Sequence, residues 1–261
     1  MNISLKGKNA LVGGSSKGIG KAAAIELAAL GANITLVSRS PQIMSEVIQE
    51  LDTSQGQDHD FLVADFSDIA DLKKKATALS MAKTIHILVN NTGGPAGGAI
   101  VEARFEEFLK AMNNHLICNH LLTQTFLKGM KEAGYGRIIN VISTSVKQPI
   151  DGLGVSNTTR GAVANWAKTM ANEVAQFGIT VNNVLPGSTS TDRLASIISG
   201  RAKKKGIPIE EEIVIWKNNV PAKRFAEPKE IGGVVAFLAS PAASYINGIN
   251  LPVDGGRTKS L

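Results

Sequence analysis

The stretch ALVGGSSKGIG at Ala10–Gly20 joins the end of an apolar run to a glycine-rich turn. Lys8–Gly13 predicts a buried strand, and Gly18–Leu30 predicts a helix that begins inside the turn. Glycines at such a turn permit a tight bend and the close approach of a pyrophosphate, and the free N–H groups of the helix start favour an anion. This unit therefore predicts dinucleotide binding, with the candidate contacts Gly14, Ser16, Lys17, Gly18, Ile19 and Gly20.

Beyond the turn, short apolar runs alternate with longer amphipathic stretches. We expect strands at 8–13, 33–38, 59–64, 85–90, 136–143, 180–185 and 249–253. We expect helices at about 18–30, 41–51, 69–82, 106–131, 157–177 and 228–239, with two helical pieces before the last. Continuous apolar runs are typical of a parallel sheet covered on both faces. The pattern predicts one α/β domain over residues 1–261, a doubly wound Rossmann-type sheet of about seven strands.

Small or polar residues follow six of the predicted strands. Ligands of open α/β sheets bind beyond the carboxyl ends of the strands, where these residues meet. The sequence therefore predicts one binding edge, made by Gly14–Gly20, Arg39, Asp65, Asn91–Gly94, Ser143–Ser145 and Pro186–Gly187.

The end of the second strand favours NADP(H) over NAD(H). An acidic residue there would bind the ribose 2′-hydroxyl and repel a 2′-phosphate, but the sequence has Ser38 and Arg39. Arg39 and Ser38 suit a phosphate, with Lys17 in the neighbouring turn. The alternative is that these cations are ordinary surface residues without a ligand.

Composition indicates a globular protein of a reducing compartment. The chain has 261 residues, 43% of them hydrophobic, and Cys118 is its one cysteine. No disulfide within the chain is therefore expected, which suits the cytoplasm. We identify no signal peptide and no run near the about 20 apolar residues of a membrane span. No metal site is assigned.

The net charge of +6 favours anionic ligands such as nucleic acid, phosphorylated cofactors or an acidic carrier. A basic cluster lies at Arg201 and Lys203–Lys205, but aromatic residues are 5% of the chain and none interleaves with it. This argues against nucleic acid. The cluster is interpreted as a solvated helix end, or as a contact for an acyl carrier or coenzyme A.

These features together resemble the short-chain dehydrogenase/reductase family, and within it the 3-oxoacyl-acyl-carrier-protein reductase-like group. The resemblance covers essentially the whole chain, through Ala10–Gly20, Leu88–Gly94, Gly136–Ser143, Gly178–Gly187 and Gly248–Gly256. It implies hydride transfer between NADP(H) and a carbonyl or alcohol, and a homotetramer or homodimer. It also implies further cofactor contacts at Asp65, Phe66, Asn91, Thr92, Gly93, Arg160, Pro186, Gly187, Thr189 and Thr191.

The catalytic positions depart from the family pattern. The family uses a tyrosine as proton donor, a lysine four residues later, a serine and an asparagine. These positions fall on Ser156, Arg160, Ser143 and His115, so only the serine is kept. An aliphatic hydroxyl is a far weaker acid than a phenol, and an arginine stays protonated. The two tyrosines, Tyr135 and Tyr245, are not expected at the site.

His115 is the candidate for the missing acid, because histidine titrates near neutral pH. We hypothesise that His115, directly or through water, delivers the proton while Ser143 and Arg160 hold the carbonyl oxygen. The alternative is a polar helix residue bonded to a backbone carbonyl. Cys118 on the same helix is interpreted as buried packing.

Residues 191–228 correspond to the lid over the substrate pocket in the family. Its apolar residues, such as Leu194, Ile197 and Trp216, favour an apolar carbonyl substrate, for example an acyl chain. Two readings stay open. One is an NADPH-dependent reductase of a 3-oxoacyl group or another ketone with an atypical proton donor. The other is an inactive NADP-binding protein that serves as a sensor or a partner subunit.

Overall fold

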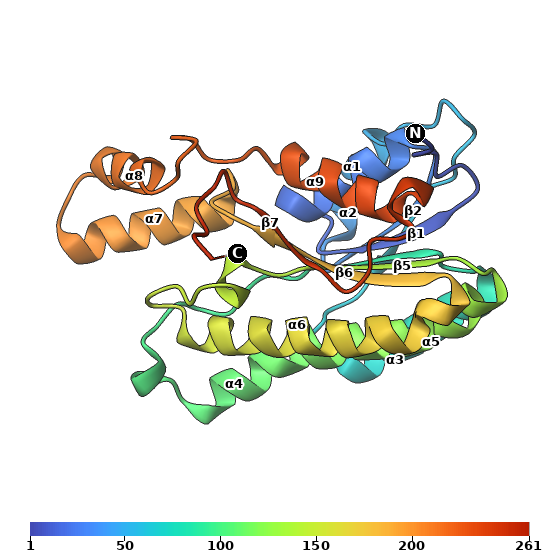
Figure 1. The fold of residues 1–261 in the computed structure, drawn as a ribbon, viewed down its shortest axis with the longest axis horizontal. Helices are drawn as coiled ribbons and strands as arrows, with labels where there is room; N and C mark the ends of the chain where they lie inside the picture. The colour runs from blue at the N-terminus through green and yellow to red at the C-terminus, as the bar shows by residue number, and fades with distance from the viewer. Residues whose placement is uncertain (261) are drawn as a thin grey trace.

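The structure is a computed structural model that describes residues 1–260 (Figure 1). Within them, seven parallel strands form one sheet in the order β3-β2-β1-β4-β5-β6-β7. The strands are β1 (Asn9–Gly13), β2 (Asn33–Ser38), β3 (Asp60–Val63), β4 (Ile87–Asn90), β5 (Gly136–Val141), β6 (Ile179–Pro186) and β7 (Asn250–Val253). The predicted single Rossmann-type α/β domain is confirmed.

Helices cover both faces of the sheet, as Figure 1 shows. One face packs against α1 (Gly18–Ala29), α2 (Pro41–Gln49) and α9 (Pro228–Ala239). The other packs against α3 (Ile69–Ala82), α5 (Cys118–Glu132) and α6 (Gly154–Val174). Each face thus has its own apolar core. The remaining helices are α4 (Phe105–Met112), α7 (Asp192–Lys205) and α8 (Ile209–Asn218).

One expectation about the elements was wrong, and a second holds with a local change. Strand β3 is not covered on both faces, because it is the edge strand, and Phe61 and Val63 on it are each 37% exposed. The helix expected at 106–131 is interrupted by a π-helical turn, Asn113–Ile117, between α4 and α5. A π turn inserts an extra residue and rotates the side chains that follow it, and such turns occur frequently at functional sites.

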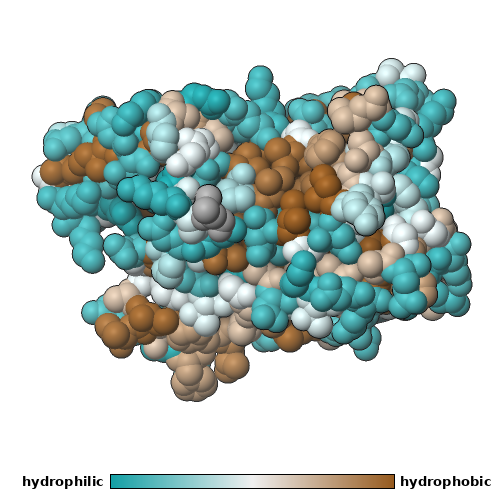
Figure 2. All heavy atoms as spheres, in the orientation of Figure 1, coloured by the Kyte–Doolittle hydropathy of each residue, from teal (hydrophilic) through white to brown (hydrophobic). Residues whose placement is uncertain are grey.

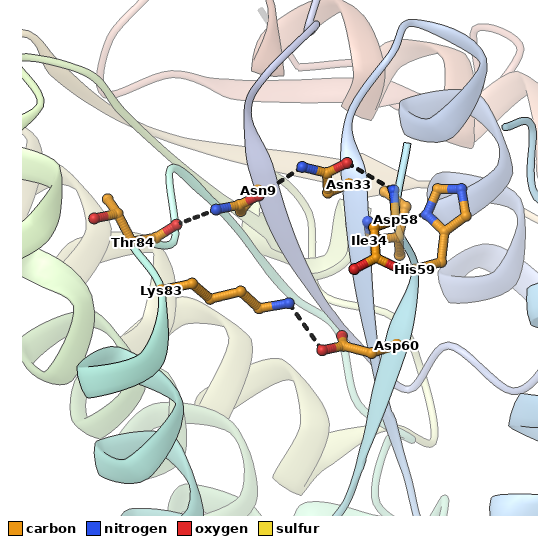
Figure 3. A network of polar contacts seen from close by, with 8 residues as sticks. All are labelled: Asn9, Asn33, Ile34, Asp58, His59, Asp60, Lys83 and Thr84. Atoms are coloured by element: carbon orange, nitrogen blue, oxygen red, sulfur yellow. Dashed lines mark hydrogen bonds and ion pairs between the residues drawn. The ribbon is translucent and has the colours of Figure 1, made fainter. Parts of the chain in front are cut away.

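A polar network ties the amino ends of the strands together (Figure 3). Asn9 accepts a hydrogen bond from Asn33 at 2.9 Å and donates to the carbonyl of Thr84 at 2.8 Å. Lys83 pairs with Asp60 at 2.9 Å. This network fixes the edge of the sheet that lies opposite the predicted binding edge.

At the carboxyl edge of the sheet, α7 and α8 extend beyond the strands (Figure 1). Thr191 caps α7 by accepting a hydrogen bond from the backbone N–H of Leu194, and Gly206 ends the helix with a φ of 67°. The two helices are joined through the buried carboxylate of Glu212, which binds Lys205 at 2.6 Å and the indole N–H of Trp216 at 2.9 Å. No helix among residues 1–260 is long and apolar enough to cross a membrane.

Candidate active site

One large cavity opens along the carboxyl edge of the sheet, with a volume of about 1370 Å³. This exceeds the 300–1,000 Å³ typical of small-ligand pockets, as expected for a site that binds a dinucleotide. The cavity brings together most of the predicted site residues: Gly14, Ser16, Lys17, Gly18, Ile19, Ser38, Arg39, Asp65, Phe66, Asn91, Thr92, Gly93, Ser143, Ser156, Arg160, Pro186, Gly187, Thr189 and Thr191. Gly20 and His115 do not line it.

The glycine-rich turn has the close packing that a phosphate cradle requires. Gly14 and Gly18 both have a φ of 58°, in the left-handed region that favours glycine. A Cβ on Gly20 would lie 2.3 Å from the carbonyl oxygen of Gly14. Asn91, after β4, closes the turn from the other side by donating to the carbonyl of Gly13 at 3.0 Å. Gly20 therefore shapes the turn without lining the cavity, and the start of α1 faces open space for an anion.

The end of β2 presents a cation to the cavity. The Arg39 side chain is 77% exposed, and its Nη1 lies 3.9 Å from Oδ2 of Asp65, after β3. Asp65 accepts hydrogen bonds from the backbone N–H and the hydroxyl of Ser67. These bonds, and then the charge of Arg39, hold the pKa of Asp65 below its ordinary value. The long Arg39–Asp65 contact is weak, so the guanidinium is available to a phosphate.

Ser143, Ser156 and Arg160 converge on the opposite part of the same cavity. Ser143 begins a short 3-10 turn after β5, where its hydroxyl accepts the N–H of Ser145 at 3.1 Å. Ser156 and Arg160 lie one turn apart on α6. The Arg160 side chain is buried and donates from Nη1 to the carbonyl of Val141 at 3.2 Å. Burial, and then the charge of Arg193, lower the pKa of Arg160 to about 10, so it stays a cation at neutral pH.

His115 lies on the π turn and does not line the cavity. It is 2% exposed, and its Nδ1 forms a 2.6 Å hydrogen bond with the hydroxyl of Thr92, which does line the cavity. Burial, and then the charge of Arg160, lower its pKa to about 3. The imidazole is therefore neutral near pH 7, so His115 is not in the protonated form that would act as an acid. These findings favour the alternative of a hydrogen-bonded helix residue, with a side-chain hydroxyl as its partner.

We expect the stability of the fold to depend on pH through His115. His115 is neutral in the folded protein and titrates near 6.5 when unfolded, so its contribution is complete above pH 6.5 and is lost as the pH falls toward 3. At pH 5 we expect the free energy of unfolding to be about 2 kcal/mol lower than at pH 7 because of His115. The variant His115→Gln should not show this decrease. Urea unfolding at pH 7 and pH 5 measures it, with His120→Gln as the control. Equal pH dependence of wild type and His115→Gln would contradict it.

Asn114 and Arg193 are two polar residues among the cavity residues that the sequence did not predict. Asn114 lines the cavity next to the position assigned to His115, because the π turn shifts which side chains of this helix face inward. Arg193, in the first turn of α7, also lines the cavity. Its sequence signal is weak, since a cation directly after an exposed aspartate is typical of a solvated helix start.

The tyrosines lie where the sequence indicates. Tyr135 precedes β5 and donates from its hydroxyl to the carbonyl of Ala239. Tyr245 is fully exposed, and neither tyrosine lines the cavity. Cys118 is buried and donates from Sγ to the carbonyl of Phe66 at 3.1 Å. Burial raises the pKa of its thiol to about 11, which agrees with a packing role.

A doubly wound sheet whose glycine-rich turn and neighbouring strand ends open into one cavity defines a dinucleotide-binding protein of the Rossmann type. A family model described as Enoyl-(Acyl carrier protein) reductase matches residues 14–258. The chain belongs to the short-chain dehydrogenase/reductase family.

Curated relatives match over nearly the full length. A 3-oxoacyl-(acyl-carrier-protein) reductase of Vibrio cholerae is 34% identical over 97% of this chain and 98% of its own. A 2-dehydro-3-deoxy-D-gluconate 5-dehydrogenase of Bacillus subtilis is 34% identical over 97% of this chain and 96% of its own. Among solved structures, L-sorbose reductase from Gluconobacter frateurii, complexed with NADPH and L-sorbose, has a TM-score of 0.92 and 30% identity, with full coverage of both chains.

Proposed function

We propose that this protein is an NADPH-dependent oxidoreductase that reduces a carbonyl to an alcohol. The observation that carries the proposal is that one cavity joins the glycine-rich turn to Ser143 and Arg160. The family, and relatives solved with NADPH bound, support the cofactor. The alternative of an inactive NADP-binding sensor or partner subunit is less favoured, because the curated relatives are oxidoreductases.

The cofactor would lie along the cavity from Arg39 to Arg160. The start of α1 would hold its pyrophosphate, and Arg39 with Ser38 would hold the 2′-phosphate. Asp65 and Phe66 would flank the adenine, and Asn91 to Gly93 the ribose and nicotinamide. Bound there, NADPH supplies the hydride.

Ser143 and Arg160 would hold the carbonyl oxygen that becomes negative during hydride transfer. Ser143 lines the cavity, and its hydroxyl would donate one hydrogen bond, while Arg160 brings a permanent charge. Burial strengthens both interactions, because water screens them less.

Water would supply the proton through the hydroxyl of Ser156. No tyrosine lines the cavity within the described part of the chain, and His115 is neutral and faces Thr92. A serine hydroxyl takes a proton from water as it passes its own to the alkoxide, so it relays without titrating. His115 then acts as a positioning residue for Thr92.

Residues 191–228 would form the substrate lid. Leu194 and Ile197 of α7 line the cavity, whereas Val214 and Ile215 of α8 are exposed. The apolar lining suits a carbon chain. The exposed cations Lys203 and Lys204 would contact an acyl carrier or coenzyme A if the substrate is bound to one. Lys205 is paired with Glu212, so it is not part of such a surface.

The protein would act as a homotetramer or homodimer. Apolar side chains gather on the exposed surface around the start of α4, the brown area at the lower left of Figure 2. They are Ile100, Val101, Phe105 and Leu109, which are 54%, 91%, 69% and 58% exposed. An apolar patch of this kind marks an interaction site, and light scattering measures the mass of the assembly.

Arg39→Glu should reverse the cofactor preference. The charge-assisted hydrogen bonds of one cation are worth about 1.5–3 kcal/mol, so the Kd of NADPH should rise about 10- to 100-fold or more. The Kd of NADH should stay within about threefold, since it has no 2′-phosphate for the new carboxylate to repel. Fluorescence titration measures both, and Lys74→Glu, the same charge change on the exposed face of α3, is the control. An equal weakening of NADH would contradict the assignment.

A carbonyl panel followed by NADPH absorbance tests the function itself. We expect oxidation of NADPH with at least one class among ketones, quinones, sugars and acyl thioesters. Tight NADPH binding without turnover across the panel would favour the inactive alternative.

A further inference from the structure

The buried guanidinium of Arg160 lacks a full set of partners. The residue is 7% exposed, and its Nε has no hydrogen-bond partner among residues 1–260. Its Nη1 donates to a backbone carbonyl, a neutral group. No carboxylate forms an ion pair with it in the described chain. A buried charge without a counter-charge is costly, and such a group is expected to meet an anion that arrives with a ligand.

Arg193 brings a second cation to the same corner. Its Nη2 donates to the carbonyl of Pro95 at 2.6 Å. A Cβ on Gly94 would lie 3.6 Å from Nη2 of Arg160 and 3.9 Å from Nη2 of Arg193, so the two guanidiniums meet above this glycine. Their charges repel, which contributes to the lowered pKa of Arg160. The fold holds two like charges together at a place where an anion would relieve the repulsion.

The acidic residues of the cavity are engaged elsewhere. Asp192 pairs with Lys17 at 2.8 Å, and Asp65 lies beside Arg39. Glu227 accepts from the first turn of α9 in a capping box. The Arg160–Arg193 pair therefore has no protein anion, and the cavity leaves this position to a ligand.

The position of Arg160 favours the substrate over the cofactor as the source of that anion. The glycine-rich turn faces Thr191, whose Cγ2 lies 3.3 Å from a Cβ on Gly18. Arg160 instead attaches to Val141, at the end of β5, one helical turn from Ser156. Arg160 thus lies toward the part of the cavity that contains Ser156, and Arg193 reaches Arg160 from the start of α7 across Gly94.

We propose that Arg193, together with Arg160, binds a carboxylate of the substrate while Arg160 also contacts the carbonyl oxygen, so that the substrate is an oxo acid. This inference rests on the proposed function. Planar guanidinium forks match a carboxylate bidentately, and the apolar Leu153 and Ile197 accommodate the intervening carbons. The carbonyl carbon takes the hydride of NADPH and the carbonyl oxygen takes one proton from water, so the products are a hydroxy acid, NADP⁺ and a hydroxide ion that the solvent neutralises. The carboxylate is unchanged.

Matched pairs of oxo acids and their methyl esters test the proposal. With wild type, kcat/KM should be about 10- to 100-fold higher for an acid than for its ester. Arg193→Met should remove most of this preference by lowering the value for the acid alone, with an unchanged Kd for NADPH. Lys74→Met, the loss of an exposed cation on α3 away from the cavity, should keep the preference.

Other outcomes overturn the proposal or separate it from the function. If the wild-type protein reduces acids and esters equally well, the proposed reductase function stands but the proposed oxo-acid substrate is contradicted. A raised Kd for NADPH in Arg193→Met, with acid and ester affected alike, would assign Arg193 to the cofactor pyrophosphate. If no carbonyl is reduced, 3-hydroxybutyrate titrated into the NADP⁺-saturated protein decides. Binding that Arg193→Met abolishes supports the carboxylate site, and no binding to wild type removes it.

Discussion

Ser143→Ala lowers kcat about 10²- to 10³-fold, the usual cost of removing one donor to a developing oxyanion. Ser143 lines the cavity at the end of β5, and removal of its hydroxyl leaves Arg160 alone on the carbonyl oxygen. The Kd of NADPH should stay within about threefold, since the glycine-rich turn is untouched. Steady-state kinetics on the best panel substrate, together with NADPH titration, separate the two quantities.

Ser145→Ala is the matched control for this prediction. Ser145 belongs to the same 3-10 turn, and its buried hydroxyl oxygen has no partner among residues 1–260 and does not line the cavity. The kcat of the Ser145→Ala variant should change little. A Ser143→Ala enzyme with wild-type turnover would remove Ser143 from the reaction and leave Arg160 as the candidate for oxyanion stabilisation.

Gly20→Ala raises the Kd of NADPH about 10- to 100-fold, which corresponds to the 1–3 kcal/mol that overpacking costs. The new Cβ would lie 2.3 Å from the carbonyl oxygen of Gly14 and 2.7 Å from Nδ2 of Asn91. Gly14 and Asn91 both belong to the phosphate cradle. They must move apart to make room for the new Cβ, which opens the turn. The effect reaches the cofactor through Gly14, because Gly20 itself does not line the cavity.

Gly233→Ala is the control for Gly20→Ala. It also lies in a helix, α9, but a Cβ there meets nothing within 4 Å. It should leave the Kd unchanged and stabilise the helix slightly. Calorimetry measures binding, and thermal unfolding checks that both variants are folded. An unchanged Kd in a folded Gly20→Ala protein would contradict the proposed cradle.

The sequence was informative where local chemistry sets the structure. The predicted bounds of α3 and α9 match, because Asp68 caps the first and Pro228 begins the second. The strand ends that carry small or polar residues do meet at one edge, because parallel strands align their carboxyl ends.

Long-range packing decides the features that the sequence did not reveal. The exposure of β3 follows from strand order, which the apolar run at 59–64 does not encode. The π turn at Asn113–Ile117 has the same apolar spacing as a regular helix. The sequence therefore did not show that Asn114, and not His115, lines the cavity. Arg193 reaches Gly94 only because α7 folds back over the loop after β4.

Calorimetric titration of the wild-type protein with NADPH and NADH tests the central claim most directly. We expect saturable binding of one NADPH per chain, at least about tenfold tighter than the binding of NADH because of the phosphate contacts of Arg39. No heat of binding with NADPH, in a protein shown to be folded, would contradict it.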